Sequence, residues 1–325
     1  MISKFKFALF GVLKEITNYL FGTGISKRIP GTLVVHDFLV RHLWPYQNTI
    51  EIQGSKMYVN VYDKDPSMRR TFQSYAICRE WEQSTTKIFR EVIKEGETVV
   101  DLGANIGYFT LLAASLVGKK GKVYSFEPEP RNYNYLLKNI ELNGYDNVFA
   151  FQKAVSDETG KTKLYICPYD TGHHTINQNG GIKKCKSDFI DYENEFVEVE
   201  KIALDDFFKE IEQPINVIKM DIEGAEMLAL SGMDRIINEN ENIKMFIEFF
   251  PLLIREMGGS PEGFIRRLLN DYRFSIFVIP DDHDASIKKS IKIKNADELM
   301  NLCKGERDVV NLFIIKDGDT VGSLS

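Results

Sequence analysis

A glycine-containing junction and a downstream glutamate form the first pattern in this sequence that could do chemistry. The segment VVDLGANIGYFTLLAAS joins an apolar strand to a helix through four notable residues: Asp101, Gly103, Asn105 and Gly107. Glycines here let the backbone approach a ligand, and the free N–H groups at a helix start can bind it. The glycines alone could instead serve tight strand–helix packing. Glu127, 24 residues after Gly103, is placed to bind both hydroxyls of a ribose. The pattern therefore predicts a site for NAD, FAD or S-adenosylmethionine.

The elements that must position these residues alternate between short apolar runs and helical segments. From residue 97 onward the runs cover residues 97–102, 122–126, 148–155, 216–221, 242–249, 274–279 and 308–315. Strands that alternate with helices predict a mostly parallel sheet covered on both faces. Upstream, residues 1–24, 31–44 and about 80–94 predict helices, and 49–61 a β-hairpin. We expect an N-terminal helical and hairpin extension over residues 1–80 and one α/β domain over 81–325.

Composition limits the class of protein. The chain has 325 residues, of which 43% are hydrophobic, so it is neither disordered nor fibrous. Its formal net charge of -6 gives no global positive field for binding duplex DNA. The cysteines show no CxxC pair, which argues against a disulfide framework and a structural zinc site, and favours a reducing cytoplasmic setting. They are Cys78, Cys167, Cys185 and Cys303.

Five segments carry a family resemblance. They are DLGANIGYFT (101–110), FEPEPRNYNYLLKNIELNG (126–144), AVSDETGKTKLYI (154–166), VIKMDIEGAEMLALSGM (217–233) and FIEFFP (246–251). In this order and spacing they resemble the FkbM family of S-adenosylmethionine-dependent methyltransferases, and KMDIEGAE is the most specific of the motifs. The resemblance covers about residues 80–315.

The resemblance implies a class I methyltransferase fold, which is Rossmann-like. The expected sheet has seven mostly parallel strands with helices on both faces, and its last strand, residues 311–316, is antiparallel. The implied cofactor is S-adenosyl-L-methionine. By position, Asp101 would lie near the methionine amino end, Glu127 would bind the ribose, and Asp221 would face the methyl group and the acceptor. Gly103, Asn105 and Gly107 would form the turn under the cofactor. The adenine pocket would involve Asn132, Ala154 and Val155.

The family's activities imply O-methylation of a hydroxyl group on a sugar, glycolipid or related metabolite. The enzyme must align the acceptor oxygen and remove its proton. We expect Asp221 to act as base or orienter with His174 assisting, and we count Glu223 and Glu248 as further catalytic candidates. Glu82 and His173 are expected to bind substrate. Carboxylates at a helix start, Glu223 and Glu226, could instead be structural, with Lys219 pairing one of them.

Two alternatives stay open for chemistry and activity. Asp221, Glu223 and Glu248 could gather a divalent cation, because carboxylate oxygens suit such ions, although we expect no metal. Methylation of nitrogen on protein or RNA is a rival activity, and a noncatalytic cofactor-fold module is a second. The acidic balance counts against an RNA acceptor.

The net charge is distributed unevenly between the N-terminal helix region and the rest of the chain. Residues 1–30 contain five basic residues and one acidic residue, a net of +4, which leaves -10 for the remainder. A basic amphipathic helix can lie on an anionic membrane, pack on the protein's own core or contact a second subunit. Its apolar run is too short to cross a bilayer. We expect a cytoplasmic protein, or one peripheral on the inner membrane surface, with a small-molecule or glycan acceptor and no nucleic-acid partner; a homo-oligomer is left open.

Overall fold

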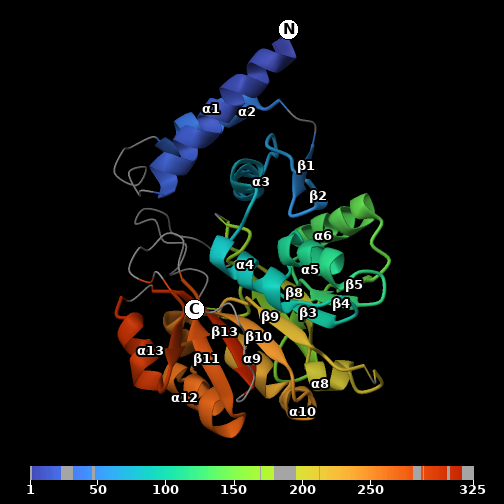
Figure 1. The fold of residues 1–325 in the computed structure, drawn as a ribbon, viewed down its shortest axis with the longest axis vertical. Coiled ribbons are helices and arrows are strands. Elements are labelled where there is room, and N and C mark those ends of the chain that lie inside the picture. The colour runs from blue at the N-terminus through green and yellow to red at the C-terminus, as the bar shows by residue number, and fades with distance from the viewer. Residues whose placement is uncertain are drawn as a thin grey trace.

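The computed structural model describes nine stretches of the chain, shown in Figure 1. They are residues 2–22, 32–45, 48–168, 170–178, 195–211, 213–280, 287, 289–305 and 308–316. The helices are α1 Ile2–Gly22, α2 Thr32–Leu43, α3 Pro66–Cys78, α4 Gln83–Val92, α5 Tyr108–Val117, α6 Pro130–Asn143, α8 Leu204–Phe207, α9 Glu226–Ser231, α10 Asp234–Glu239, α11 Pro251–Glu256, α12 Pro261–Arg266, η2 Arg267–Asp271 and α13 Ala296–Leu302. The strands are β1 Thr49–Ile52, β2 Ser55–Tyr58, β3 Thr98–Leu102, β4 Lys122–Phe126, β5 Val148–Phe151, β6 Ala154–Val155, β7 Gly160–Tyr165, β8 Phe196–Ile202, β9 Val217–Met220, β10 Lys244–Phe249, β11 Phe274–Val278, β12 Ile291–Ile293 and β13 Val310–Lys316.

The central sheet confirms the predicted class I methyltransferase architecture. Its strand order is β12-β11-β13-β10-β9-β3-β4-β5, so it has eight strands instead of seven. Strands β5, β4, β3, β9 and β10 are parallel, and β13 runs antiparallel to both β10 and β11 as predicted. The additional strand is β12, which pairs with the free edge of β11. Its three residues, IKI, form too short an apolar run to be recognised in the sequence.

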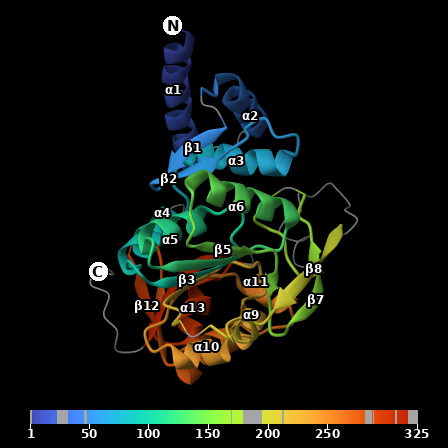
Figure 2. The same ribbon diagram turned by 90° about the vertical axis from the view of Figure 1, so that its right-hand side faces the viewer.

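Alternating side chains divide the core into two layers. In β9, Val217 packs with one apolar cluster, while Ile218 and Met220 pack with the other. The first cluster includes side chains of α4, α5 and the N-terminal elements, and the second includes side chains of α8, α10 and α12. The helices therefore cover both faces of the sheet, as seen in Figures 1 and 2. A strand that is buried on both sides reads as a continuous apolar run, which is why these strands were predictable.

The N-terminal elements attach to the α/β domain through the hairpin. Its turn lies at Gln53 and Gly54, both with positive φ, within the predicted hairpin over 49–61. Side-chain amides of α6 bind the hairpin backbone: Asn139 Oδ1 accepts from Tyr58 N at 2.6 Å, and Asn143 Oδ1 accepts from Lys56 N at 2.7 Å. The next helix, α3, was not predicted, although Asp65 caps it and Pro66 begins it. The predicted helix over 80–94 is α4, which is three residues shorter at its start.

A second sheet lies beside the first. Strands β6, β8 and β7 form it in that order, and Thr175 both pairs with Tyr165 at the end of β7 and donates its hydroxyl proton to Glu223 O at 2.8 Å. Of the predicted loop over 167–195, the structure describes residues 167–168, 170–178 and 195. Cys167 is disulfide-bonded, unlike the free Cys78 and Cys303, so the expectation of reduced cysteines is corrected at this position. Within the described chain, no helix is long and apolar enough to cross a membrane.

Candidate active site

The predicted glycine turn is built by contacts between the ends of three strands. Gly103 N and Ala104 N both donate to Phe126 O at 3.0 Å, which fixes the end of β3 against the end of β4. Gly103 has φ +79, and a Cβ there would lie 1.9 Å from Asp221 O after β9. Only glycine can therefore occupy this position, because both the backbone angle and the close approach exclude a side chain.

A pocket opens directly beside this turn. It holds about 630 Å³ of empty space, which includes open solvent at its mouth. The predicted residues that line it are Gly103, Asn105, Glu127, Ala154, Val155, His174, Asp221 and Glu223. The other predicted residues lie outside its lining: Glu82, Asp101, Gly107, Asn132, His173 and Glu248. The pocket lies at the carboxyl ends of β3, β4 and β9, where ligands bind in open α/β sheets.

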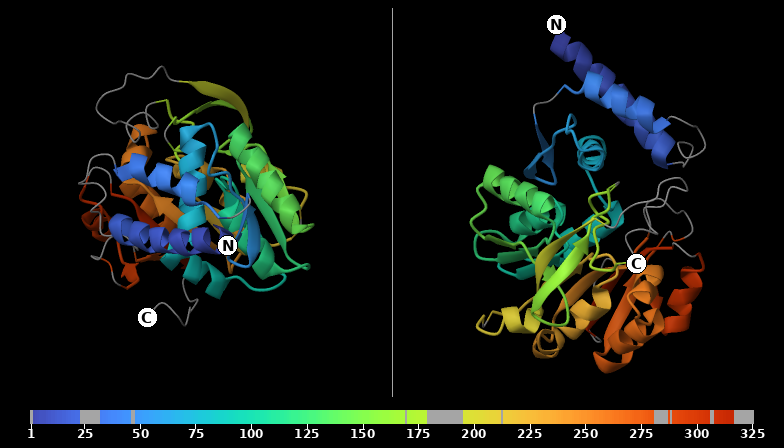
Figure 3. Two further views of the ribbon diagram at one scale, coloured as in Figure 1. Left: turned by 90° about the horizontal axis from the view of Figure 1, so that it is seen from above. Right: turned by 180° about the vertical axis from the view of Figure 1, so that it is seen from behind.

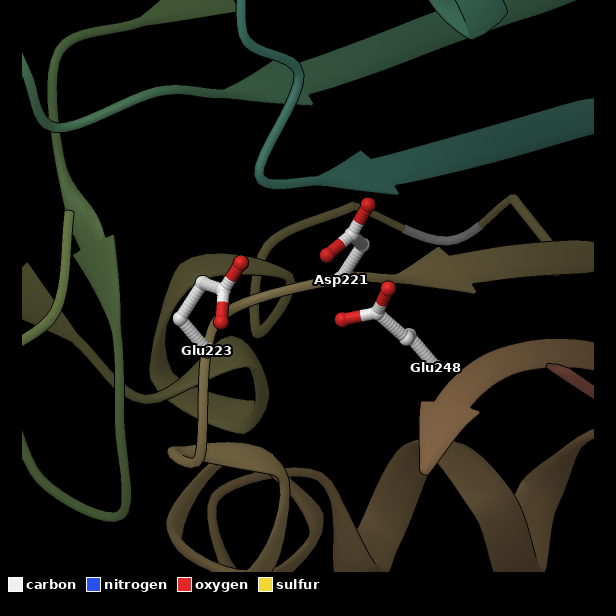
Figure 4. A group of neighbouring side chains, drawn as sticks. All are labelled: Asp221, Glu223 and Glu248. Carbon is white, nitrogen blue, oxygen red and sulfur yellow. The ribbon is translucent and has the colours of Figure 1, made fainter. Parts of the chain in front are cut away.

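Three of the predicted carboxylates converge beside the pocket. Asp221, Glu223 and Glu248 each offer an oxygen, and these oxygens lie within 4.8 Å of one another. Figure 4 shows them converging from the end of β9, the following loop and β10. We call these three side chains the carboxylate group. Its oxygen donors would suit a hard divalent cation such as Mg²⁺ or Ca²⁺.

A neighbouring carboxylate, Glu226, has a structural role. Glu226 Oε1 accepts from Gly224 N at 3.2 Å and Ile222 N at 3.4 Å, so it holds the loop that carries Asp221 and Glu223. Burial is the main cause that raises the pKa of Glu226, to about 7. These contacts support a structural role for Glu226, the alternative raised by the sequence.

A buried lysine balances the charge of this region. Lys219 is 5% exposed, and its Nζ donates to Asp221 Oδ2 at 3.1 Å. Burial alone would lower the pKa of Lys219, but the attraction of three carboxylates outweighs it and raises the pKa. These carboxylates are Asp221, Glu82 and Asp101. The sequence-based pairing of Lys219 with Glu223 or Glu226 is corrected, because its hydrogen-bonded partner is Asp221.

Six side-chain-bearing residues of the described chain have positive φ, and two of them, Asn105 and Glu223, line the pocket. Asn105, Glu223 and Glu82 have φ of 50°, 53° and 44°, values that side-chain-bearing residues rarely adopt. Such strain persists where the surrounding structure enforces it, and it gathers at functional sites. Figure 4 shows the Glu223 carboxylate close to those of Asp221 and Glu248.

A comparison with known families agrees with this geometry. The family model described as Methyltransferase FkbM domain matches residues 101–276, more than half of the chain. The chain belongs to the FkbM methyltransferase family. The predicted resemblance is thereby confirmed, and S-adenosylmethionine is the cofactor of this FkbM protein.

Individual relatives cover parts of the chain. Methyltransferase 1 of Beauveria bassiana is 30% identical over 145 residues, which are 42% of this chain and 58% of the relative. Hexuronic acid methyltransferase AglP of Haloferax volcanii is 25% identical over 154 residues, 47% of this chain and 56% of the relative. The chain thus spans a little over half the length of these curated relatives. A solved methyltransferase FkbM from Methylobacillus flagellatus aligns with 78% of this chain and 55% of its own, at 17% identity and a TM-score of 0.37.

Buried acceptor atoms in this FkbM protein fit the cofactor's donor groups. Among the described residues, Asp101 Oδ1 and Asn105 Oδ1 are buried without a hydrogen-bond partner. The other oxygen of Asp101 accepts from Thr110 Oγ1 at 2.6 Å, which fixes the carboxylate. Unsatisfied buried acceptors are costly, so a ligand that supplies N–H or O–H donors is expected there. The amino and ribose hydroxyl groups of S-adenosylmethionine are such donors.

Glu127 connects the turn to the cofactor pocket. Its Oε2 accepts from Asn105 N at 2.7 Å, and its Oε1 accepts from Glu129 N at 2.9 Å. Burial raises the pKa of Glu127 to about 8, although these backbone donors act in the opposite direction. A proton on this carboxyl group would compete with ribose hydroxyls, so cofactor binding should favour its ionised form.

Replacing Glu127 with glutamine should weaken S-adenosylmethionine binding about tenfold or more, because a charged hydrogen-bond acceptor is lost. Since the pKa lies near 8, parental affinity should rise between about pH 6 and 8 as Glu127 ionises, and then level off. The variant should show no such rise. Isothermal titration calorimetry across this pH range measures both effects. Glu141→Gln, an exposed change on α6, is the control. Unchanged affinity with the pH dependence intact would remove Glu127 from the cofactor site.

The two histidines have different surroundings. His174 Nδ1 accepts from Cys167 N at 3.0 Å, and burial lowers the pKa of His174 to about 4. His174 is therefore neutral near pH 7, with one ring nitrogen already occupied. His173 Nε2 lies 3.8 Å from Glu223 Oε1. The roles assigned from the sequence stay predictions, but this geometry favours His173 for proton exchange with the carboxylate group.

Several contributors to the site were missed in the sequence. Thr171 lines the pocket, and its carbonyl accepts from Asn132 Nδ2 at 2.9 Å. Its hydroxyl also lies 2.8 Å from Thr71 Oγ1, which belongs to α3. Tyr75 of α3 is buried; burial and then repulsion from Tyr108, Glu82 and Asp221 raise its pKa. The N-terminal extension therefore contributes to the rim of the site through contacts about 100 residues apart, for which the sequence offers no periodic signal.

Proposed function

We propose that this FkbM protein transfers the methyl group of S-adenosylmethionine to a hydroxyl group of a neutral sugar, glycolipid or related metabolite. The observation that carries the proposal is the meeting of Asp221, Glu223 and Glu248 beside the cofactor pocket. The name of the Haloferax relative, a hexuronic acid methyltransferase, supports a sugar as the general class of acceptor, and the preference for a neutral sugar rests on the charges of this site alone. Membership of the FkbM methyltransferase family supports methyl transfer.

The carboxylate group supplies what hydroxyl methylation requires of the protein. The bound cofactor provides an electrophilic methyl group, so the chain must align an oxygen with it and remove the oxygen's proton. Asp221 is the side chain that we assign to receive this proton. Lys219 donates to Asp221 Oδ2, which favours the ionised carboxylate and fixes its direction. Glu223 and Glu248 can accept hydrogen bonds from further hydroxyl groups of the same acceptor.

The charge of the site favours a neutral acceptor. Glu82 lies close enough to Asp221 for the two negative charges to repel each other. Burial, and then this repulsion, raise the pKa of Glu82. Lys219 is the buried cation that these acids share. An acceptor that carries its own carboxylate would add repulsion in a partly desolvated site, whereas hydroxyl groups donate to the acids. A neutral polyol therefore fits better than a uronic acid.

The product linkage tests this proposal. Full-length protein should be incubated with methyl-labelled S-adenosylmethionine and either neutral glycosides, uronic acids or a total glycolipid extract. We expect label in neutral acceptors, and the label should survive mild alkali because methyl ethers resist it while methyl esters do not. Demethylated cofactor should form in equal amount. Mass spectrometry of the labelled product identifies the methylated position.

Three outcomes would contradict the proposal. Alkali-labile label would mean that a carboxyl group is methylated, and label confined to uronic acids would exclude the preference for neutral acceptors. Label in protein or RNA, with none in the carbohydrate fractions, would favour the rival N-methyltransferase activity. Calorimetric cofactor binding is measured on the same preparation, so that inactive protein is recognised.

A further inference from the structure

The two N-terminal helices, α1 and α2, expose apolar side chains that the rest of the described chain does not match. The large apolar residues that are more than half exposed are Val12, Ile16, Val34, Val35, Phe38 and Tyr62. Five of them lie on α1 or α2, and the sixth, Tyr62, donates its hydroxyl proton to Arg41 O of α2. In the described α/β domain, exposed large apolar side chains such as Phe149, Phe196 and Ile291 are no more than 45% exposed.

These exposed residues are distinct from the faces that hold the helices in place. On α1, Phe10 and Leu13 are buried, and the Phe10 ring packs edge-on against Trp44 at 5.3 Å between centroids. Val12 and Ile16 stand four residues apart and so form one stripe on another side of α1. Figures 1 and 3 show α1 and α2 side by side, projecting from one end of the molecule. We call them the N-terminal helix pair.

We propose that the N-terminal helix pair docks this enzyme on an anionic membrane surface. Charge complementarity supports this occupant: α1 carries three lysines against one glutamate, within residues 1–30 whose net charge is +4, whereas the remainder of the chain carries -10. On the same helix as Val12 and Ile16, Lys6 and Glu15 are exposed and Lys14 is half-buried, near enough to Cys78 of α3 to oppose the rise that burial causes in the pKa of that thiol. An anionic surface attracts such a helix and repels the acidic domain, so only the projecting end touches lipid.

A second copy of the chain fits this surface less well. A two-fold dimer brings the same patch of both chains together, and here that would place one basic helix against its equivalent. A head-to-tail contact with the acidic domain would not close and would favour open chains of molecules. The membrane satisfies the apolar stripe and the charge together, independently of the acceptor's identity.

Vesicle flotation of the full-length protein tests the docking. We expect flotation with vesicles of phosphatidylcholine and phosphatidylglycerol, little with phosphatidylcholine alone, and loss at high salt. Val12→Ser/Ile16→Ser/Phe38→Ser should reduce partitioning at least about tenfold, since apolar burial is lost. The matched control is Phe149→Ser/Phe196→Ser/Ile291→Ser on the α/β domain, which should float like the parent.

A charge-reversal pair provides an independent arm. Lys6→Glu/Lys14→Glu should abolish the preference for anionic vesicles, whereas Lys119→Glu/Lys120→Glu, an equal change at exposed positions between α5 and β4, should retain it. Calorimetric cofactor binding verifies that every variant is folded. Absence of flotation by the parent, or equal flotation of the helix-pair variants and their controls, would overturn the proposal. A parental dimer in light scattering that the serine variant makes monomeric, without vesicle binding, would assign the surface to a second copy.

Discussion

Replacing Asp221 with asparagine should lower the rate of methyl transfer at least about 100-fold, the usual scale for loss of a general base. Asparagine keeps the shape of the side chain but cannot accept the hydroxyl proton. Cofactor affinity should change little, since the predicted cofactor contacts lie at Asp101, Asn105 and Glu127. Single-turnover rates measured with saturating acceptor and calorimetric affinities separate the two effects.

The neighbouring acids make this test specific to Asp221. Glu223→Gln and Glu248→Gln should raise KM more than they lower kcat, because we assign both to the acceptor's other hydroxyl groups. Asp146→Asn, at an exposed position before β5, should leave all constants unchanged. A variant of Asp221 with parental kcat, or a larger loss of kcat on changing Glu223, would transfer the role of base to another carboxylate.

Local sequence patterns were sufficient to predict site residues where a single segment determines the backbone conformation. The run that ends in Asp101 and Gly103 identifies a buried strand and a turn, because glycine and apolar spacing report directly on backbone conformation. Glu127 could be placed for the same reason, since the carboxyl ends of adjacent parallel strands meet at one edge. The family resemblance extended this placement to Asp221 and Glu248, whose convergence the structure describes.

Contacts between distant segments could not be read in the same way. Thr71 and Thr171 are 100 residues apart, and neither has a pattern that indicates the other. Glu223 has a positive φ, which an acidic residue seldom adopts. The backbone conformation that carries its side chain could therefore not be predicted from residue type. Lys219 did carry a signal: a lysine within the apolar run of β9 must be paired when buried. Its choice among several carboxylates depends on side-chain positions in three dimensions.

Replacing Lys219 with methionine should have the second large effect, and it should act through Asp221. Methionine keeps most of the volume beside Phe109 but removes the cation, so three carboxylates lose their shared partner. Breaking a buried ion pair typically costs about 3–5 kcal/mol of folding free energy, and protonation of the acids reduces that cost. We expect a lower unfolding midpoint and at least about a 100-fold loss of activity near pH 7.

The pH profile distinguishes this role from simple support of the fold. In the parent, Lys219 has a raised pKa, so it stays charged and contributes stability at all pH values below its unfolded range, near 10.5. Its positive charge lowers the pKa of Asp101 and Glu82 against the effect of burial. Without the charge of Lys219, the acids ionise only at higher pH, so the acidic limb of the pH–activity profile should shift to higher pH. Lys244→Met breaks the pair with Glu97 in the same sheet and should destabilise without this movement.

A double-mutant cycle settles whether Lys219 works through Asp221. Lys219→Met/Asp221→Asn removes both charges, so it should be more stable than Lys219→Met alone, which leaves the half-buried Asp221 carboxylate without its lysine. Its residual rate should equal that of Asp221→Asn, because a positioning residue has nothing left to position. Additive losses of rate in the double variant would contradict this coupling, and they would mean that Lys219 contacts the reacting groups independently of Asp221.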